Sequence, residues 1–357
     1  MWLARLGSLN ALEQTQPSRF WHRFLGAPLP SADTLGRVPE RLAADSIRDA
    51  LHQIYTLLKR NKALAATSHG LTALVLDGHE THASYRRHCA GCCVRHVGSE
   101  EAPRQQFYHR VVSALLLGGE LRLWLDVEPQ RPGEDEIAAA VRLLERVLER
   151  YPRAFDVVLG DALYTDPRLY AVALRHGKDV LTVLKNEDRD LIQDARALCA
   201  TLPPQQLSEQ CRAWDVAGLE SWPQAGRSVR VVQTQESLLP RPGSQRTVSE
   251  WLWVTTLSPH RACTRAVIAL GHARWEIENQ GFNEFGHRWL ADHVYRHHPN
   301  ALLSFWLLGM LAFNVFFAFA RRNLQPACRR RFSHLHLARC LAEEIYDGLA
   351  LPDPRAP

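Results

Sequence analysis

The sequence predicts a mixed α/β fold in which helices cover the faces of one mixed sheet. Between residues 71 and 184, short apolar runs bounded by turn residues alternate with amphipathic stretches in the order β-β-β-α-β-α-β. Two early strands are joined by a hairpin signal and the later ones are separated by helices, so both antiparallel and parallel pairing are expected. A chain of 357 residues, 46% of them apolar, can bury a large core.

Residues 1–64 are predicted to form a helical N-terminal region. Pro28, Pro30 and Pro39 interrupt it, and Asp45 is the expected N-cap of its last helix. Behind this cap, apolar residues recur at helical spacing, namely Ile47, Leu51, Ile54 and Leu58.

Five strands are predicted after this region. They cover residues 71–76, 108–117, 121–128, 155–159 and 179–184. Gly118-Gly119 joins the second strand to the third as a hairpin, and Asp77 and Asp161 follow the first and fourth strands. A helix with the apolar stripe Ile137, Val141, Leu144 and Leu148 follows the third strand, and a helix over 167–176 follows the fourth.

The pattern changes after residue 189. Several Pro, Gly and Trp residues and two strand-like runs, 228–232 and 251–255, indicate a β-rich insertion over residues 190–258. A long helix carrying Arg274, Trp275 and Glu278 is expected after Pro259. The predicted organisation is therefore a helical region (1–64), a core (65–189 and 259–325), the insertion (190–258) and a basic C-terminal tail (326–357).

One segment, residues 301–320, contains 20 residues without a charge and is long enough to span a bilayer. A buried core helix gives the same pattern, and Asn314 within the segment is polar. No cationic segment leads into a long apolar run at the N-terminus, so no secretory signal is predicted and a cytoplasmic location is expected.

Basic residues are concentrated toward the C-terminus. The net charge is +5, and residues 285–341 contain eight Arg, no Lys and one acid, Asp292. Such a region favours a polyanionic partner, although a solvated basic surface has the same composition.

Cysteine usage favours a reducing compartment, with one cluster at Cys89-x-x-Cys92-Cys93. His82, His88 and His96 flank this cluster, which suggests part of a zinc site. A second Cys pair at suitable spacing is missing, so a loop with ordinary thiols remains the alternative.

Several enzyme classes are excluded by missing motifs. His79-Glu80-Thr81-His82 is one residue short of the H-E-x-x-H metalloprotease spacing, and neither G-x-x-x-x-G-K-[ST] nor G-x-S-x-G occurs. ATP hydrolysis and serine hydrolase chemistry are therefore not expected.

Three acids form the positive evidence for a site. Asp77 and Asp161 at strand ends would project into the crevice where α/β sheets bind ligands, and neighbouring strands lie about 4.8 Å apart. A divalent cation would relieve the repulsion between these carboxylates, and Glu278 on a packed helix would complete a site for two Mg²⁺ or Mn²⁺ ions. Two such ions support phosphodiester cleavage.

Four stretches carry a family resemblance: LVLDG at 74–78, PGEDE at 132–136, DVVLGDALY at 156–164 and RWEIENQGFNE at 274–284. In this order the chain resembles bacterial insertion-sequence DDE transposases of the Y-R-E-K group over residues 30–325. The resemblance implies an RNase H-like core with strand order 3-2-1-4-5, a β-rich insertion and a buried helix at 301–320. It further implies metal-dependent DNA cleavage and strand transfer, with Asp77, Asp161 and Glu278 holding two Mg²⁺, and a homodimer on DNA.

The signature is matched in part. Arg274 and Glu278 fit its spacing, whereas Gly271 takes the Tyr place and Phe285 the Lys place. By the resemblance Arg274 contacts DNA phosphates, and His287 or Arg288 is the candidate substitute for the missing Lys.

Three further residues are candidates for roles in such a site. Trp275 or Trp289 is a candidate to stack on an unpaired base, and His109 to orient a water, although core packing is the commoner role for each. Members of this group carry more sequence before a stretch like residues 1–64, so Met1 is expected to be an internal start or a truncation. A remnant that only binds DNA is the alternative function.

Overall fold

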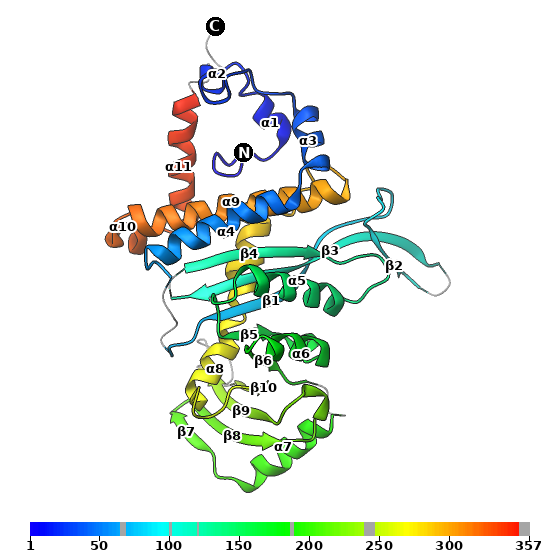
Figure 1. The fold of residues 1–357 in the computed structure, drawn as a ribbon, viewed down its shortest axis with the longest axis vertical. Helices are drawn as coiled ribbons and strands as arrows, with labels where there is room; N and C mark the ends of the chain where they lie inside the picture. The colour runs from blue at the N-terminus through cyan, green and yellow to red at the C-terminus, as the bar shows by residue number, and fades with distance from the viewer. Residues whose placement is uncertain (65–68, 100–101, 120, 186–188, 239–246, 350–357) are drawn as a thin grey trace.

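The computed structural model describes residues 1–64, 69–99, 102–119, 121–185, 189–238 and 247–349 (Figure 1). Within these ranges the chain forms a ten-stranded mixed sheet with helices on both faces, which confirms the mixed α/β prediction. The strands are β1 (Ala73–Ser84), β2 (Cys93–Val97), β3 (Arg104–Gly118), β4 (Leu121–Pro129), β5 (Val157–Gly160), β6 (Asp179–Val183), β7 (Gln205–Ser208), β8 (Cys211–Leu219), β9 (Val229–Leu238) and β10 (Thr247–Thr255).

Five of these strands lie in the order β4-β3-β1-β5-β6, which is the expected order 3-2-1-4-5. β1 pairs with β5 and β5 with β6 in parallel, whereas β3 pairs antiparallel with both β1 and β4. β10 pairs antiparallel with β6, so the strands of residues 205–255 continue the same sheet.

The first strand is longer than expected, and β2 was not predicted. Asp77-Gly78 does not form a turn, because antiparallel pairing with β3 continues from Ala73 as far as Ser84. The strand residues are fully buried only as far as Leu76, and Asp77 is partly exposed. The apolar run therefore ends before the strand does, and in the sequence its end resembles the end of a strand. β2 pairs with the outer part of β3 and forms an arm that projects from the sheet in Figure 1.

Helices cover the two faces of the sheet in different ways. α5 (Glu136–Arg150) and α6 (Pro167–Arg175) pack on the face reached by Leu74 and Val158. The opposite face, reached by Val75 and Leu159, packs against α8 (Thr264–Ala273), the π-helix η3 (Ile277–Arg288) and α9 (Pro299–Asn323). α8 and η3 pass behind the sheet in Figure 1. α7 (Asp190–Thr201) lies beside β8.

The apolar segment 301–320 lies within α9, which contacts β4, α3 and α4. α9 is the one helix in the described ranges that is long and apolar enough to span a membrane, and 56% of its most apolar window is buried by the rest of the chain. Met310 and Phe313 in its middle are buried. This packing supports the interpretation of α9 as a core helix.

Asn314 explains how α9 is held against the edge strand β4. Its side chain is fully buried, accepts a hydrogen bond from the backbone N–H of Trp124 (3.0 Å) and donates one to the carbonyl of the same residue (2.7 Å). β4 has β3 as its single strand partner among the described strands, so Asn314 replaces strand pairing at this position.

We expect Asn314→Leu to destabilise the protein by about 2–4 kcal/mol, because two buried backbone groups lose their partner. The measurement is chemical or thermal unfolding, and Val315→Leu on the exposed side of α9 is the matched control. Equal stability of the two variants would contradict this role of Asn314.

Four helices form the N-terminal region: α1 (Leu9–Glu13), α2 (Arg19–Leu25), α3 (Ala32–Arg41) and α4 (Ala44–Arg60). The predicted N-cap at Asp45 was wrong, because α4 begins at Ala44 and Asp45 lies in its first turn. There Asp45 pairs with Arg48, whose buried guanidinium also donates to Asp126 on β4 (2.8 Å). This ion pair joins α4 to the sheet.

Residues 326–349 continue as two helices, α10 (Pro326–Arg331) and α11 (His334–Leu349), so this part of the predicted tail has regular structure. α11 buries Leu337 and Ala338. Residues 350–357 of the tail lie outside the described residues.

Candidate functional site

Asp77 on β1 and Asp161, directly after the parallel neighbour β5, lie at the same level of the sheet. The β1–β5 register pairs Val75 with Leu159, and each acid follows two residues later along the chain. Side chains two residues apart point to the same face, so both acids share the face of Val75 and Leu159, on which η3 packs. This juxtaposition agrees with the sequence-based expectation, although Asp77 lies within β1 rather than at its end.

Glu278 reaches this pair through Arg274. Nη1 of Arg274 lies 2.6 Å from Oε1 of Glu278 and 3.6 Å from Oδ2 of Asp77. The Arg274 side chain is 10% exposed, and its Nε has no hydrogen-bond partner among the described residues. One guanidinium therefore lies between two of the three acids and keeps an unused buried donor.

The environment of Asp77 raises the pKa of its carboxyl group. Burial first, and then the like charge of Asp161, raise the pKa of Asp77 to about 7; Arg274 opposes this effect and Glu278 adds to it. Oδ1 of Asp77 accepts one hydrogen bond, from the N–H of Gly78 (2.8 Å). Asp161 accepts a hydrogen bond from the N–H of Leu163 (2.8 Å), which fixes it at the start of a 3₁₀ turn (Ala162–Tyr164).

The helical segment that carries Glu278 is a π-helix over most of its length. The N–H of Trp289 donates to the carbonyl of Glu284, an i→i+5 bond. With about 4.4 residues per turn, the position nine residues after Glu278 returns to its face, and positions four and five lie on either side of it. Of these, Asn283 and His287 are exposed and Phe282 is buried, whereas Ile277 and Phe285 elsewhere on the helix are fully buried.

Core packing occupies both positions at which the sequence departs from the signature. In an α-helix a residue seven positions after Glu278 would share its face, whereas in η3 that residue, Phe285, packs against Trp124, Trp306 and Phe313. At Gly271 a side chain would overlap the indole of Trp253. The Tyr and Lys places are thus filled by core packing.

The rival acids lie elsewhere. Glu276 pairs with Arg122 (3.1 Å), and Glu284 is 8% exposed in the neighbourhood of Arg5 and Arg288, so neither joins Asp77. Among the residues weighed for DNA contact, Arg288 is exposed, but Trp289 is buried against Phe313 and Phe316. Stacking of Trp289 on a base is therefore incompatible with this packing.

Trp275 is 37% exposed and packs edge-on against Trp251 (5.0 Å between ring centroids). It keeps accessible ring surface, unlike Trp289. His109 is 8% exposed and contacts Cys89 and Cys92, so the proposed role in orienting a water at the acids was wrong.

Sequence reasoning missed a buried carboxylate that supports the site. Glu136, the first residue of α5, accepts hydrogen bonds from Tyr164 (2.9 Å) and Arg110 (2.7 Å). It packs directly over Gly78, where any side chain would overlap its carboxylate. A side chain after Asp77 would displace this hydrogen-bonded carboxylate. The close approach, and not a turn, therefore explains the Gly of the Asp-Gly pair.

The acids fit hard divalent cations by donor type, since all three supply carboxylate oxygens. Yet they are not drawn into one tight cluster. Across the described ranges, one group of metal-binding side chains has all its ligand atoms within 4.8 Å of one another. It consists of Cys89, Cys92, His109 and His297.

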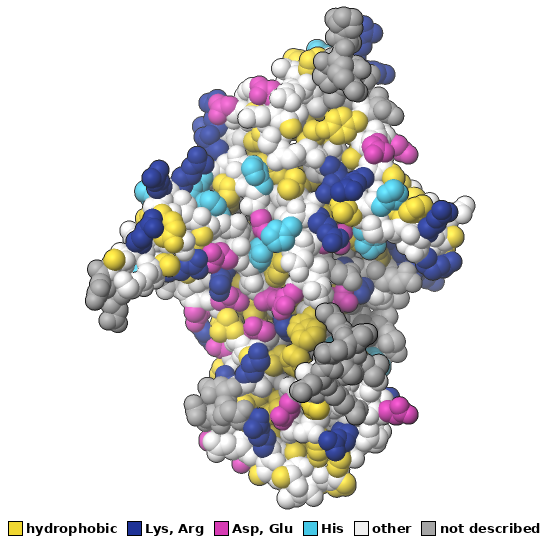
Figure 2. All heavy atoms as spheres, turned by 180° about the vertical axis from the view of Figure 1, so that it is seen from behind, with side chains coloured by type: hydrophobic (Ala, Val, Ile, Leu, Met, Phe, Trp, Pro, Cys, Tyr) yellow, Lys and Arg dark blue, Asp and Glu magenta, His cyan; other side chains and the backbone are white. Residues whose placement is uncertain are grey.

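Charged side chains surround the middle of the molecule on the face shown in Figure 2. Acidic side chains gather near the centre, with basic side chains above them on both sides.

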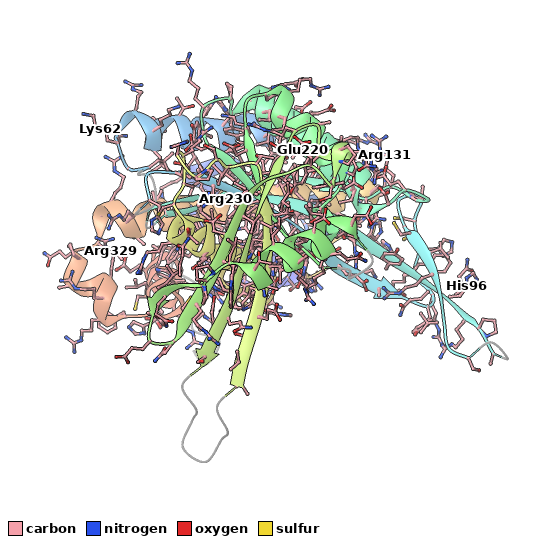
Figure 3. All side chains as sticks on the ribbon, turned by 90° about the horizontal axis from the view of Figure 1, so that it is seen from below. Lys62, His96, Arg131, Glu220, Arg230 and Arg329 are labelled. Carbon is pink, nitrogen blue, oxygen red and sulfur yellow. The ribbon has the colours of Figure 1, made fainter. Side chains whose placement is uncertain are left out.

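A basic hollow of about 620 Å³ lies between α9, α10 and α11. It is lined by Arg321, Arg329, Arg330 and His334. Figure 3 shows Arg329 of α10 and His96 of the β2 arm at opposite sides of the molecule.

No protein-family model matches the chain, and none of the curated proteins does.

We expect the affinity for Mg²⁺ or Mn²⁺ to rise about tenfold per pH unit below pH 7 and to level off above it. The pKa of Asp77 is about 7, so a metal ion must displace a proton below that pH. Calorimetric titrations between about pH 5.5 and 8.5 measure the slope. Asp77→Asn removes the titrating group, and the same slope in this variant would contradict the assignment.

Proposed function

We propose that the chain is a DDE transposase of the insertion-sequence type, acting on DNA phosphodiesters through Asp77, Asp161 and Glu278. The observation that carries the proposal is the placement of Asp77 and Asp161 at one level of the sheet, with Nη1 of Arg274 3.6 Å from Asp77 and 2.6 Å from Glu278. The strand order β4-β3-β1-β5-β6 supports the RNase H-like core that the family resemblance implies.

In this proposal the three carboxylates hold two Mg²⁺ or Mn²⁺ ions. Such ions, when bound, activate the attacking oxygen and stabilise the leaving oxygen of a phosphodiester. When all three acids are ionised they carry three negative charges and Arg274 one positive charge, so the site can accept added cationic charge. When no metal ion is bound, Arg274 offsets part of the negative charge of Asp77 and Glu278.

Arg274 has a second role in the proposal. A guanidinium binds phosphate through several N–H groups, and Nε of Arg274 has no hydrogen-bond partner among the described residues. This Nε is buried, so a DNA phosphate would have to enter the site to reach it. Of the residues on the Glu278 face of η3, His287 can take over the phosphate contact of the missing Lys, with Arg288 beside it. The basic hollow around Arg329 and Arg330 offers further contacts to the DNA backbone.

The test is cleavage of DNA that carries the inverted repeats flanking the coding sequence, with Mg²⁺ or Mn²⁺ compared with EDTA. Nicks at the repeat ends that require the metal support the proposal. Metal binding without any nicking would instead support the remnant that only binds DNA, which the filled Tyr and Lys places favour. Localisation in the cytoplasm and a homodimer on DNA belong to the same proposal, and sedimentation with repeat DNA tests the dimer.

A further inference from the structure

We propose that Cys89, Cys92, His109 and His297 form a structural zinc site, separate from the acidic site and independent of the proposed function. The Cys pair lies in the connection between β1 and β2, His109 lies on β3, and His297 lies two residues before α9. The sequence offered a single Cys pair, and two histidines distant in sequence supply the remaining ligands.

The distances between ligand atoms match a tetrahedral zinc ion. With Zn–S near 2.3 Å and Zn–N near 2.05 Å, a tetrahedron separates two sulfurs by about 3.8 Å and a sulfur from a nitrogen by about 3.6 Å. The Sγ atoms of Cys89 and Cys92 are 3.8 Å apart. Nε2 of His109 lies 3.3 and 3.2 Å from them, and Nε2 of His297 lies 3.6 Å from Sγ of Cys92.

A backbone group also points at the cluster. The N–H of Cys89 donates to Sγ of Cys92 (3.2 Å), and metal-bound sulfur ligands commonly accept N–H···S contacts of this kind.

Close packing brings the Cys pair to the start of α9. At Gly91, between the two cysteines, a side chain would lie 3.1 Å from Pro299 and 3.5 Å from the His109 ring. A zinc ion here would join the β2 arm, the central sheet and the start of α9. Four protein ligands fill the tetrahedral positions of a zinc ion. Because no ligand position is left open, the set suits a structural rather than a catalytic ion.

The test uses the full chain without a histidine tag, purified from cells grown with zinc. Elemental analysis after dialysis is expected to give about one zinc per chain, and Co²⁺ substitution should give thiolate charge-transfer bands and tetrahedral d–d bands. Cys92→Ser and His297→Ala should lower the zinc content at least about tenfold. Cys93→Ser and His82→Ala are matched controls, because both residues are neighbours of the cluster outside its ligand set.

His297→Cys keeps the test informative if the Ala variant does not fold, since a Cys₃His set should retain the metal. A zinc-selective chelator that leaves Mg²⁺ bound should lower the melting temperature of the wild type and not that of Cys92→Ser. The proposal is overturned if the purified wild type holds no zinc and takes up no Co²⁺, if Cys89 and Cys92 are found as a disulfide, or if His297→Ala binds zinc as the wild type does. None of these outcomes depends on DNA cleavage.

Discussion

Asp77→Asn or Asp161→Asn is expected to reduce metal-dependent DNA cleavage by about three orders of magnitude or more while leaving DNA binding within about twofold. Each change removes one of three carboxylates, which lowers both the negative charge and the number of oxygen ligands available to the two ions. In the proposal, DNA binding depends on basic side chains elsewhere, including those of the hollow around Arg329, so it is expected to persist.

Matched variants separate this effect from general damage. Glu278→Gln should behave like the two Asp variants, whereas Glu276→Gln, on the same helical segment but paired with Arg122, should cleave normally. Asp166→Asn is a second control, because Asn can still cap α6 as Asp166 does. If Asp77→Asn cleaves as fast as the wild type, the acidic site is wrongly assigned.

Stability measurements add an independent check on Asp77. Its folded-state pKa of about 7 lies above the ordinary value of 3.8, so ionisation of Asp77 opposes folding. The penalty is absent below about pH 4, grows as the pH rises and is complete above about pH 7. Without metal, Asp77→Asn should therefore raise the melting temperature at pH 8 more than at pH 5, and a uniformly less stable variant would contradict this account.

The sequence predicted the elements near the acids well because apolar periodicity follows burial. The runs that became β3, β4, β5 and β6 are buried over most of their length, and the hairpin at Gly118-Gly119 joins β3 to β4. The end of β1 was misjudged at Asp77-Gly78, since strand pairing with β3 continues after burial stops. β2 escaped prediction because it is short and partly exposed, with its neighbour β3 as sole strand partner in the described sheet.

Candidate site residues could be predicted where a local sequence pattern marks them. They could not be predicted where packing between distant segments determines their position. Asp77, Asp161 and Arg274 follow from strand ends and a signature spacing. The sequence did not indicate the π-helix, which places Phe285 in the core and leaves His287 exposed. Glu136 was missed because its role depends on Gly78 and Tyr164 from other elements, and His297 was missed because its partners are distant in sequence.

Arg274→Ala is expected to lower cleavage without lowering metal affinity, unlike the loss of an acid. Cleavage should fall by about two to three orders of magnitude, because a charged donor aimed at a transferring phosphate typically contributes that much. Metal affinity at pH 8 should be unchanged or higher, because the guanidinium that competes with cations for Asp77 and Glu278 is gone. Calorimetry with Mn²⁺ and cleavage assays on the same preparations measure the two effects.

Arg274→Lys distinguishes charge from geometry at this position. Lysine keeps the charge but lacks the planar fork of N–H donors that a guanidinium presents, so it should restore part of the cleavage and most of the competition with metal. If Arg274→Ala lost metal binding together with cleavage, the side chain would be holding the acids in place, and its proposed contact with phosphate would be wrong. If cleavage alone were lost, Arg274 would serve the DNA substrate, and the acids would bind the cations without it.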